Sequence, residues 1–421
     1  MSAALAGLLA LAVRVAVIVA TPGYRPRHDD ASYVRVAHSL LALGRYPGHH
    51  LPGGGWQQSA YRPPGWPVAL AAVWHLVGVD DLLAARALAA VLGAAAVVLT
   101  ATLAGRLFGP RAAVATGVLA ALSPLAVAVD ASLESEALFT CLVVASACTA
   151  LAARSSGRRW AAAGAGLLAG LAALTRLNGL VLVPIVAALA LPPTLPWRRR
   201  VVHIAVPVVV AALLIAPWTL RNATQLHAFV PVSTETGNTL AGVYNHASLR
   251  HGARWLLPAH TGAYRAIYRR YGAGAKADGA LTGAVVRWVA RHPAYPARVL
   301  VDNSARLLGL TGPAWAAFSL RTMSLGKAGA ALVWAGVLAV TLLALAGARA
   351  ARGRGAPRTV WLMLAALFVP VALVNGELRL GAPAQALLLP LAGLAVATAV
   401  ERAGGLLRRG RSGALQMGDG A

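Results

Sequence analysis

Two adjacent carboxylates, Asp29 and Asp30, follow the first long apolar stretch of the chain, and Tyr33 lies one helical turn further on. A carboxylate held next to a substrate can take a proton from an attacking hydroxyl, so this pair offers a general base. Apolar residues recur at helical spacing after the pair, which predicts an amphipathic helix lying on a membrane surface. On spacing alone, an aspartate that caps this helix is the simpler interpretation, and the catalytic one stays open beside it.

The elements that must position these acids are strongly apolar. Of 421 residues, 58% are hydrophobic and 12% are charged, whereas a globular chain carries about 25% charged residues. A membrane-crossing helix needs about 20 mainly apolar residues, and ten stretches qualify. They are 3–21, 84–105, 112–129, 137–153, 160–175, 179–193, 201–217, 328–348, 358–375 and 381–400. The sequence therefore predicts an all-α, polytopic transmembrane helical bundle, with 64–79 as an interfacial or re-entrant helix.

Arginines mark one side of the predicted bundle. With the N-terminus placed inside, every short inner connection is basic, from Arg106 and Arg111 to the tail after residue 402, as the positive-inside rule requires. The acids segregate to the other side, and only Glu401 and Asp419 lie inside. We therefore expect a multi-pass protein of the cell inner (plasma) membrane, with both termini cytoplasmic and its chemistry on the extracytoplasmic face.

Two outer segments, 22–83 and 218–326, are long, whereas every inner connection is short. The second outer segment interleaves tyrosines with arginines, which suits helices at a membrane interface. The sequence predicts four modules. They are an N-terminal transmembrane module 1–217 with the catalytic first outer loop 22–83 and a second acidic outer loop 130–136, an extracytoplasmic segment 218–326, C-terminal transmembrane helices 327–402, and a basic cytoplasmic tail 403–421 expected to be disordered.

The net charge of +25 does not indicate nucleic-acid binding, because no basic block is interleaved with aromatic residues on a polar domain. The inner arginines are better explained by topology and by contacts with membrane lipids. A transporter typically has internal repeats and polar groups near the middle of the bilayer. Here no repeat is found and the ionisable residues gather at span ends, which favours chemistry at the outer membrane surface.

Several motifs resemble the GT-C superfamily of membrane glycosyltransferases, in particular the branch with protein O-mannosyltransferases and lipid A aminoarabinose transferases. That branch carries an acidic pair and a tyrosine after its first span. The segment Asp29-Asp30-Ala31-Ser32-Tyr33 is similar, with Asp30 in place of the more usual glutamate. Tyr61-Arg62-Pro63-Pro64 resembles its Lys-Pro-Pro element, and arginine keeps the positive charge. Ser135-Glu136-Ala137 resembles its second acidic site, and further matches around Arg176 and Arg221 follow in family order.

The resemblance implies an enzyme that transfers a sugar from a polyprenyl-phosphate donor to an extracytoplasmic glycan, lipid or protein acceptor, with inversion. It implies that Asp29 is the general base, with Asp30 and Glu136 as further catalytic acids, although a helix dipole alone would also favour Glu136. Cations must stabilise the phosphate that leaves as an anion. The predicted substrate-binding residues are Tyr33, Tyr61, Arg62, Arg176, Arg221 and Arg379, with Lys327 as a weaker candidate. For Arg221, an interfacial arginine that only reaches lipid headgroups is an equal alternative.

A divalent cation is compatible with these carboxylates, but no ligand spacing in the sequence is diagnostic. If a metal is bound, Asp29, Glu136 and His28 are the candidate ligands, with His49, His50 and His75 as other nearby imidazoles. The rival function is a membrane transporter or lipid-linked glycan flippase without transferase chemistry. It would need polar residues along the middle of the spans, where Arg14 is nearly the only ionisable side chain.

Overall fold

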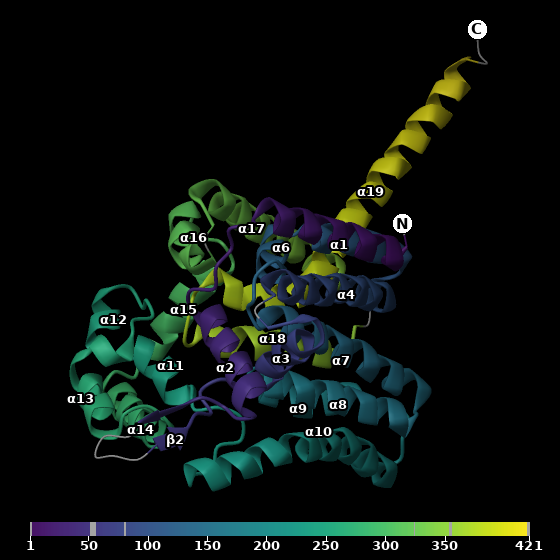
Figure 1. The fold of residues 1–421 in the computed structure, drawn as a ribbon. Coiled ribbons are helices and arrows are strands. Elements are labelled where there is room, and N and C mark those ends of the chain that lie inside the picture. Colours follow the sequence, from purple (N-terminus) through teal and green to yellow (C-terminus); the bar gives the residue numbers. More distant parts are fainter. Residues whose placement is uncertain (1, 51–55, 80, 324, 353–355, 419–421) are drawn as a thin grey trace.

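The structure is a computed structural model that describes residues 2–418 except 51–55, 80, 324 and 353–355. Its helices run side by side in one bundle, and shorter helices cover one end of it (Figure 1). Within the described residues, six helices are long and apolar enough to cross a membrane. They are α1 (Ala3–Ala20), α4 (Leu82–Phe108), α7 (Glu136–Ser156), α10 (Trp197–Leu226), α17 (Lys327–Ala350) and α19 (Ala382–Gly418). The predicted multi-pass helical membrane protein is confirmed.

Every one of the ten predicted spans contains a helix, but not all ten can cross a bilayer. The stretch 112–129 is a broken pair, α5 (Pro110–Ala121) and α6 (Pro124–Asp130), bent by 56°. Three others are short, namely α8 (Arg159–Thr175), α9 (Gly179–Leu189) and α18 (Arg358–Ala372). At 1.5 Å per residue, α9 is about 17 Å long, against about 30 Å of hydrocarbon. The prediction of ten spans was wrong for three reasons. The stretch 112–129 is bent in the middle, the stretches 179–193 and 358–375 run beyond the ends of α9 and α18, and α8 has only 17 residues.

Close packing inside the bundle depends on small residues. Gly166 of α8 lies against the backbone of Pro207 in α10, where an added Cβ would come within 2.3 Å of the Pro207 carbonyl oxygen. Gly347 of α17 meets the backbone of Leu391 in α19 in the same way. Lipid tails are as apolar as leucine, so membrane helices associate through such close contacts rather than through the hydrophobic effect. The alanine- and glycine-rich composition therefore suits this bundle.

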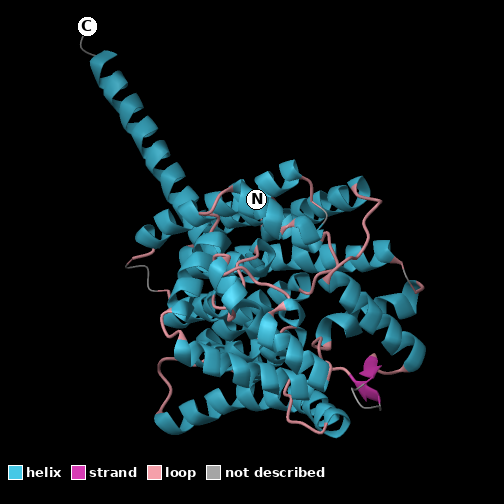
Figure 2. Cartoon of the chain, turned by 90° about the vertical axis from the view of Figure 1, so that its left-hand side faces the viewer, coloured by secondary structure: helices cyan, strands magenta, loops and turns pink. Residues whose placement is uncertain are grey.

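The first outer segment folds over the bundle end as helix, hairpin and helix. It contains α2 (Asp29–Leu43), the antiparallel strands β1 (Gly48–His50) and β2 (Trp56–Gln58), and α3 (Gly65–Val77). The amphipathic helix predicted after the acidic pair is α2. The helix predicted over 64–79 is α3, whose Trp66 and Trp74 are buried against the bundle. The small hairpin, visible in Figure 2, is a departure from the predicted all-α fold, since only a loop was expected there.

The second outer segment is a helical lobe beside the bundle end. It comprises α11 (Thr236–Val243), α12 (His246–Arg250), η1 (Pro258–His260), α13 (Gly262–Tyr271), α14 (Ala275–Arg291), α15 (Tyr295–Leu307), α16 (Pro313–Ser319) and η2 (Arg321–Met323). The lobe has an apolar cluster of its own, which includes Tyr244, Leu281 and Val299. It is tied to the bundle by the Tyr244 hydroxyl, which donates to the Leu373 carbonyl at 2.9 Å.

The C-terminal segment differs from its prediction. Residues 403–421 were expected to be disordered, but α19 continues as helix to Gly418 and leaves the bundle at its end (Figures 1 and 2). Alanine, leucine and arginine are frequent in this stretch. Glycine is more frequent still and disfavours helix, so intrinsic propensity alone does not explain why the helix extends beyond the packed core.

Candidate active site

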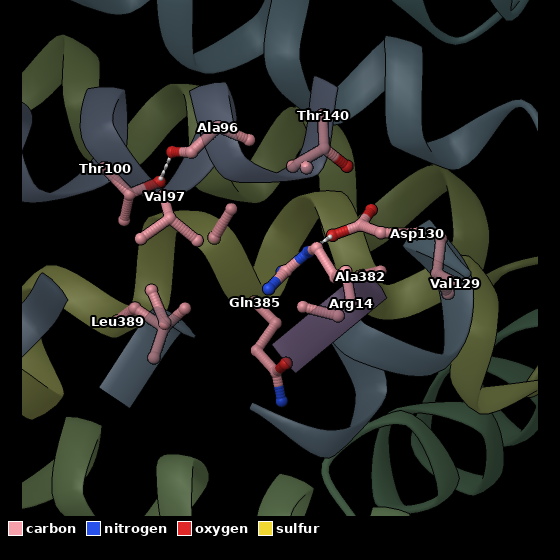
Figure 3. A pocket seen from close by; sticks show the side chains of 14 residues that line it. Arg14, Ala96, Val97, Thr100, Val129, Asp130, Thr140, Ala382, Gln385 and Leu389 are labelled. Carbon is pink, nitrogen blue, oxygen red and sulfur yellow. Dashed lines mark hydrogen bonds and ion pairs between the residues drawn. The ribbon is translucent and has the colours of Figure 1, made fainter. Parts of the chain in front are cut away.

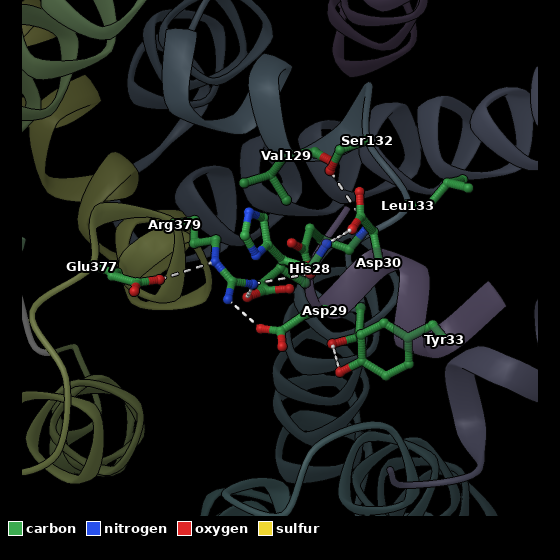
Figure 4. A network of polar contacts seen from close by, with 12 residues as sticks. His28, Asp29, Asp30, Tyr33, Val129, Ser132, Leu133, Glu377 and Arg379 are labelled. Atoms are coloured by element: carbon green, nitrogen blue, oxygen red, sulfur yellow. Dashed lines mark hydrogen bonds and ion pairs between the residues drawn. The ribbon is translucent and has the colours of Figure 1, made fainter. Parts of the chain in front are cut away.

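The carboxylate of Asp29 is the centre of the polar cluster at the outer-segment end of the bundle (Figure 4). One carboxylate oxygen contacts Nη2 of Arg62, and the other contacts Nη2 of Arg379. About a third of the Asp29 side chain, 35%, is exposed, against 10% for Arg62 and 7% for Arg379. Asp29 is thus the most exposed of these three charged groups.

Arg379 joins four acidic groups from distant parts of the chain. It lies in η3 (Leu378–Gly381), the short turn that leads into α19. Besides Asp29, its guanidinium contacts Glu134 at 2.9 Å, Glu136 at 3.3 Å and Glu377 at 3.3 Å. A buried arginine is always charged and offers five fixed donors, so it can hold several carboxylates in one arrangement.

Arg62 links the first outer segment to the helical lobe. It follows the hairpin, and its Nη1 donates to Glu235 at 2.7 Å while its Nε donates to the Ser32 hydroxyl at 3.1 Å. Tyr61, its neighbour, accepts a hydrogen bond from the Asn238 amide of α11 at 3.0 Å. The lobe therefore contributes an acid and an amide to the cluster.

Arg176 and Tyr33 complete the cluster on the side of α7. Arg176 follows α8 and pairs with Glu136 at 3.0 Å, and it also donates to the Ser135 hydroxyl at 3.0 Å. The hydroxyls of Tyr33 and Ser135 are 3.0 Å apart. Glu136 has no exposed surface, so its charge depends on these two arginines, Arg176 and Arg379.

Asp30 has a positioning role in this geometry, rather than the catalytic role predicted for it. One of its oxygens accepts hydrogen bonds from the backbone N–H groups of Arg27, His28 and Ala31, at 2.8–2.9 Å. Its other oxygen accepts from the Tyr24 hydroxyl at 2.6 Å. With its oxygens occupied and 3% of its surface exposed, Asp30 fixes the turn that begins α2 and so holds Asp29 outward.

Tyr24 and Arg86 join the two acidic loops. The Tyr24 hydroxyl, besides donating to Asp30, accepts from the backbone N–H of Leu133, one residue before Glu134. Arg86 of α4 stacks on the Tyr24 ring at 4.6 Å and donates to the carbonyls of Thr21 and Ala131 at 3.0 and 2.7 Å. These contacts hold the backbone before Asp29 and the backbone before Glu134 together, and so set the position of Asp29 relative to Glu134.

The charges of the cluster are unequal. Burial raises the pKa of Asp29, but Arg62 and Arg379 outweigh that effect and place it well below its usual range. Burial raises the pKa of Glu134 well above its usual range. The positive charge of Arg379 lowers this pKa, and the negative charge of Glu136 raises it, but burial has the largest effect. Burial likewise raises the pKa of Glu235 and of Glu377. Asp29 is therefore ionised at neutral pH, whereas Glu134, Glu235 and Glu377 hold a proton more readily than an exposed glutamate does.

The structure brings together five of the predicted site residues by direct ion pairs, namely Asp29, Glu136, Arg62, Arg176 and Arg379. Tyr33 and Tyr61 lie beneath the Arg62 guanidinium, at 4.8 and 5.0 Å from their ring centroids. Glu235 and Glu377 were read only as outer acids, and Glu134 only as a neighbour of Glu136. Their roles come from long-range contacts that no local motif encodes.

Arg221 has different partners. Its guanidinium donates to the Ser59 carbonyl at 3.0 Å and to the Gln58 amide, and it stacks on Trp218 at 4.8 Å. These contacts fasten the hairpin to the end of α10. Lys327 begins α17, and its predicted role in substrate binding has no support from a contact to the described carboxylates.

No metal site is evident in the described part of the chain, where no three His, Cys, Asp or Glu side chains are arranged to hold an ion. Of the candidate ligands, Asp29 and Glu136 both contact Arg379, and His28 is exposed at the start of α2. The side chains of His49 and His50 lie outside the described residues.

Asp130 does not belong to the outer acidic loop in which it was placed. It is buried at the end of α6, where Arg14 of α1 donates to it from Nε at 2.8 Å and lies within 2.7 Å through Nη2. Figure 3 shows this pair beside a cavity of about 30 Å³. That volume is about the space of one water molecule in the liquid, so the pair forms a structural contact rather than part of a channel.

Comparisons with known proteins agree with this architecture. Residues 61–220 match the family profile described as dolichyl-phosphate-mannose-protein mannosyltransferase. The archaeal oligosaccharyltransferase AglB from Archaeoglobus fulgidus, solved with an inhibitory peptide and a dolichol-phosphate, aligns over 98% of this chain and 52% of its own, with a TM-score of 0.57 and 16% identity. The chain has the GT-C fold.

Other solved structures extend the comparison. The Archaeoglobus fulgidus oligosaccharyltransferase in complex with Zn and sulfate covers 94% of this chain and 49% of its own, at 14% identity and a TM-score of 0.56. ArnT from Cupriavidus metallidurans, bound to undecaprenyl phosphate, covers 93% of this chain and 77% of its own, at 16% identity and a TM-score of 0.43. The chain spans about half the length of the two oligosaccharyltransferase chains that it matches. Among curated protein sequences, no match is found.

Proposed function

We propose that this protein is a membrane glycosyltransferase that moves a sugar from a polyprenyl-phosphate carrier to a hydroxyl acceptor. The observation that carries the proposal is the partly exposed Asp29 carboxylate paired with the buried guanidinium groups of Arg62 and Arg379. Under this proposal, Asp29 is the base and the two arginines are fixed cations at the end of a membrane bundle, where a lipid keeps its tail in the bilayer and presents its headgroup. The GT-C fold and the match over 61–220 support the same chemistry.

The reaction follows from the charges of these groups. The acceptor hydroxyl attacks the anomeric carbon from the face opposite the phosphate, which inverts the configuration there. The bond between that carbon and the phosphate oxygen breaks, and polyprenyl phosphate leaves with the electron pair. Asp29 takes the hydroxyl proton, while Arg62 and Arg379 stabilise the charge that develops on the leaving phosphate.

The remaining groups hold these three in place. Glu136 and Glu134 orient the Arg379 guanidinium from below, and Arg176 balances the charge of Glu136. Tyr61 and Glu235 connect Arg62 to the helical lobe, which makes the lobe the natural source of contacts with the acceptor. The acceptor is an extracytoplasmic glycan, lipid or protein under this proposal.

The orientation in the membrane is part of the proposal. The arginine-rich connections lie at the end of the bundle away from Asp29, as the positive-inside rule requires for a site on the extracytoplasmic face of the inner membrane. Both termini are then cytoplasmic. The transporter or flippase alternative would need a polar path through the bundle. The buried ion pair between Arg14 and Asp130 borders only a small cavity, so it gives that alternative no support.

A lipid analysis tests the proposed donor. A strain without this gene should accumulate a polyprenyl-phosphate monosaccharide, detected by mass spectrometry of extracted lipids, and the wild-type gene should clear it. The gene carrying Asp29→Asn should not, although the variant is present in the membrane at the wild-type level. Equal amounts of every lipid-linked monosaccharide in the deleted and complemented strains would contradict the proposal.

A further inference from the structure

A second cavity lies at the other end of the bundle from Asp29. Its volume is about 810 Å³, within the range of ligand-binding pockets. Helix α7 relates the two ends, because it begins at Glu136 in the acidic cluster and ends at Ser156, which lines the cavity. The cavity is bordered by the end of α4, the end of α7, the connection between α9 and α10, and Pro357 before α18. Four separate parts of the chain therefore line this open cavity.

The lining of this cavity is basic and rich in donors. Arg106 and Arg154 line it, and among its described lining residues no aspartate or glutamate occurs. Each arginine is anchored by one hydrogen bond from Nη1 to a backbone carbonyl, of Cys148 at 2.5 Å for Arg106 and of Leu191 at 2.8 Å for Arg154. A guanidinium group has five N–H donors, so each of these arginines is held in place with donors left for an anion.

Neighbouring residues place the cavity at the membrane interface. Trp160 at the start of α8 and Trp197 at the start of α10 are 71% and 76% exposed, beside the connections that form the cavity. Exposed tryptophans gather where hydrocarbon meets the headgroup layer. The other lining residues include leucines and prolines, and Ser155, Ser156 and Thr194 add hydroxyl groups. The cavity thus offers cationic donors at headgroup depth and apolar surface beside them.

We propose that this cavity binds the headgroup phosphate of an anionic phospholipid. Basic pockets between transmembrane helices on this side of a membrane have the chemistry to hold such headgroups. A zwitterionic lipid fits less well, because its ammonium group would enter a site that has two arginines and no acid among its described lining residues. The site is separate from the acidic cluster, and the proposal does not depend on the transferase reaction.

The test uses the full chain purified in detergent, with phosphatidylglycerol as the anionic probe and phosphatidylcholine as the neutral one. Phosphatidylglycerol should raise the thermal unfolding midpoint at lower concentration than phosphatidylcholine, since a ligand of the folded state stabilises it. The double variant Arg106→Gln/Arg154→Gln should weaken that response by more than about a hundredfold, as expected for two lost charge-assisted hydrogen bonds. The matched control, Arg198→Gln/Arg199→Gln, removes two exposed arginines that do not line the cavity and should respond like wild type.

A second variant guards against loss of folding in the first. Thr194 is exposed at the cavity, and Thr194→Trp would place a bulky ring in front of the lining while keeping both arginines. It should also lose the response to phosphatidylglycerol. An undiminished response in Thr194→Trp, or an equal loss in the two double variants, would overturn the proposal in favour of diffuse surface charge. A full response to millimolar inorganic phosphate alone would overturn it in favour of a site for a free anion.

Discussion

Replacement of Arg379 by glutamine should destabilise the protein in a way that depends on pH. Among the described ion pairs, Glu134 and Glu377 have no basic partner other than Arg379, whereas Asp29 keeps Arg62. A buried carboxylate left without its partner costs about 3–5 kcal/mol. With an unfolding entropy of about 2.1 cal/mol/K per residue and 421 residues, 1 kcal/mol corresponds to roughly 1 °C. The unfolding midpoint should therefore fall by about 3–5 °C at neutral pH.

The deficit should shrink as the pH falls. Burial raises the pKa of Glu134 and of Glu377 above the value in the unfolded chain, so the folded state binds more protons. Stability from such groups is present below the unfolded pKa and is lost as the pH rises through the folded pKa. Without Arg379 these pKa values rise further, so protonation removes the uncompensated charge progressively as the pH falls.

The assay is the thermal unfolding midpoint of the purified protein in detergent from pH 5 to pH 8. Arg221→Gln is the matched control, because Arg221 donates to a backbone carbonyl and an amide rather than to carboxylates. It should give a smaller loss that is the same at each pH. An Arg379→Gln deficit that does not change with pH, or one no larger than that of Arg221→Gln, would refute the assignment of Arg379 as the centre of the carboxylate cluster.

Three further outcomes follow from the same contacts. Tyr24→Phe removes the hydroxyl that joins the two acidic loops, so kcat for sugar transfer should fall about tenfold while the donor KM stays within experimental error. Asp130→Asn leaves Arg14 buried and unpaired and should lower the free energy of unfolding by about 3–5 kcal/mol. The double variant Arg14→Met/Asp130→Leu removes both charges and should recover most of the unfolding midpoint. Arg62→Gln should raise the pKa of Asp29, so that the acid limb of the pH–rate profile moves up by about 1–3 units, and an unmoved limb would exclude Asp29 as the titrating base.

The helices of the bundle could be predicted from hydropathy because apolar runs in a membrane have few alternatives to helix. Their lengths could not, since Pro192 and Pro193 follow α9 within an apolar stretch that looks continuous in sequence. The hairpin β1–β2 was missed because its strands are short. Its strands have three residues each, too few for a period-two pattern to stand out.

The candidate site could be predicted only in part. The resemblance to GT-C glycosyltransferases selected Asp29, Arg62 and Arg379, which are distant in sequence and meet in the structure. It could not separate Asp29 from Asp30, because that difference depends on three backbone N–H groups and the Tyr24 hydroxyl around one of them. Asp130 was misassigned because hydropathy places an acid at the end of a span and cannot reveal that an arginine from another helix meets it.

Sugar transfer by the purified protein tests the role of Asp29 most directly. The measurement is release of polyprenyl phosphate from a panel of radiolabelled polyprenyl-phosphate monosaccharides, in the presence of cell-envelope extract as acceptor. Wild-type protein should release it, and Asp29→Asn should be at least about a hundredfold slower, since a general base contributes about 10²–10⁴. The unfolding midpoint of the variant should show that it is folded. Full activity of a folded Asp29→Asn variant would contradict the proposed mechanism.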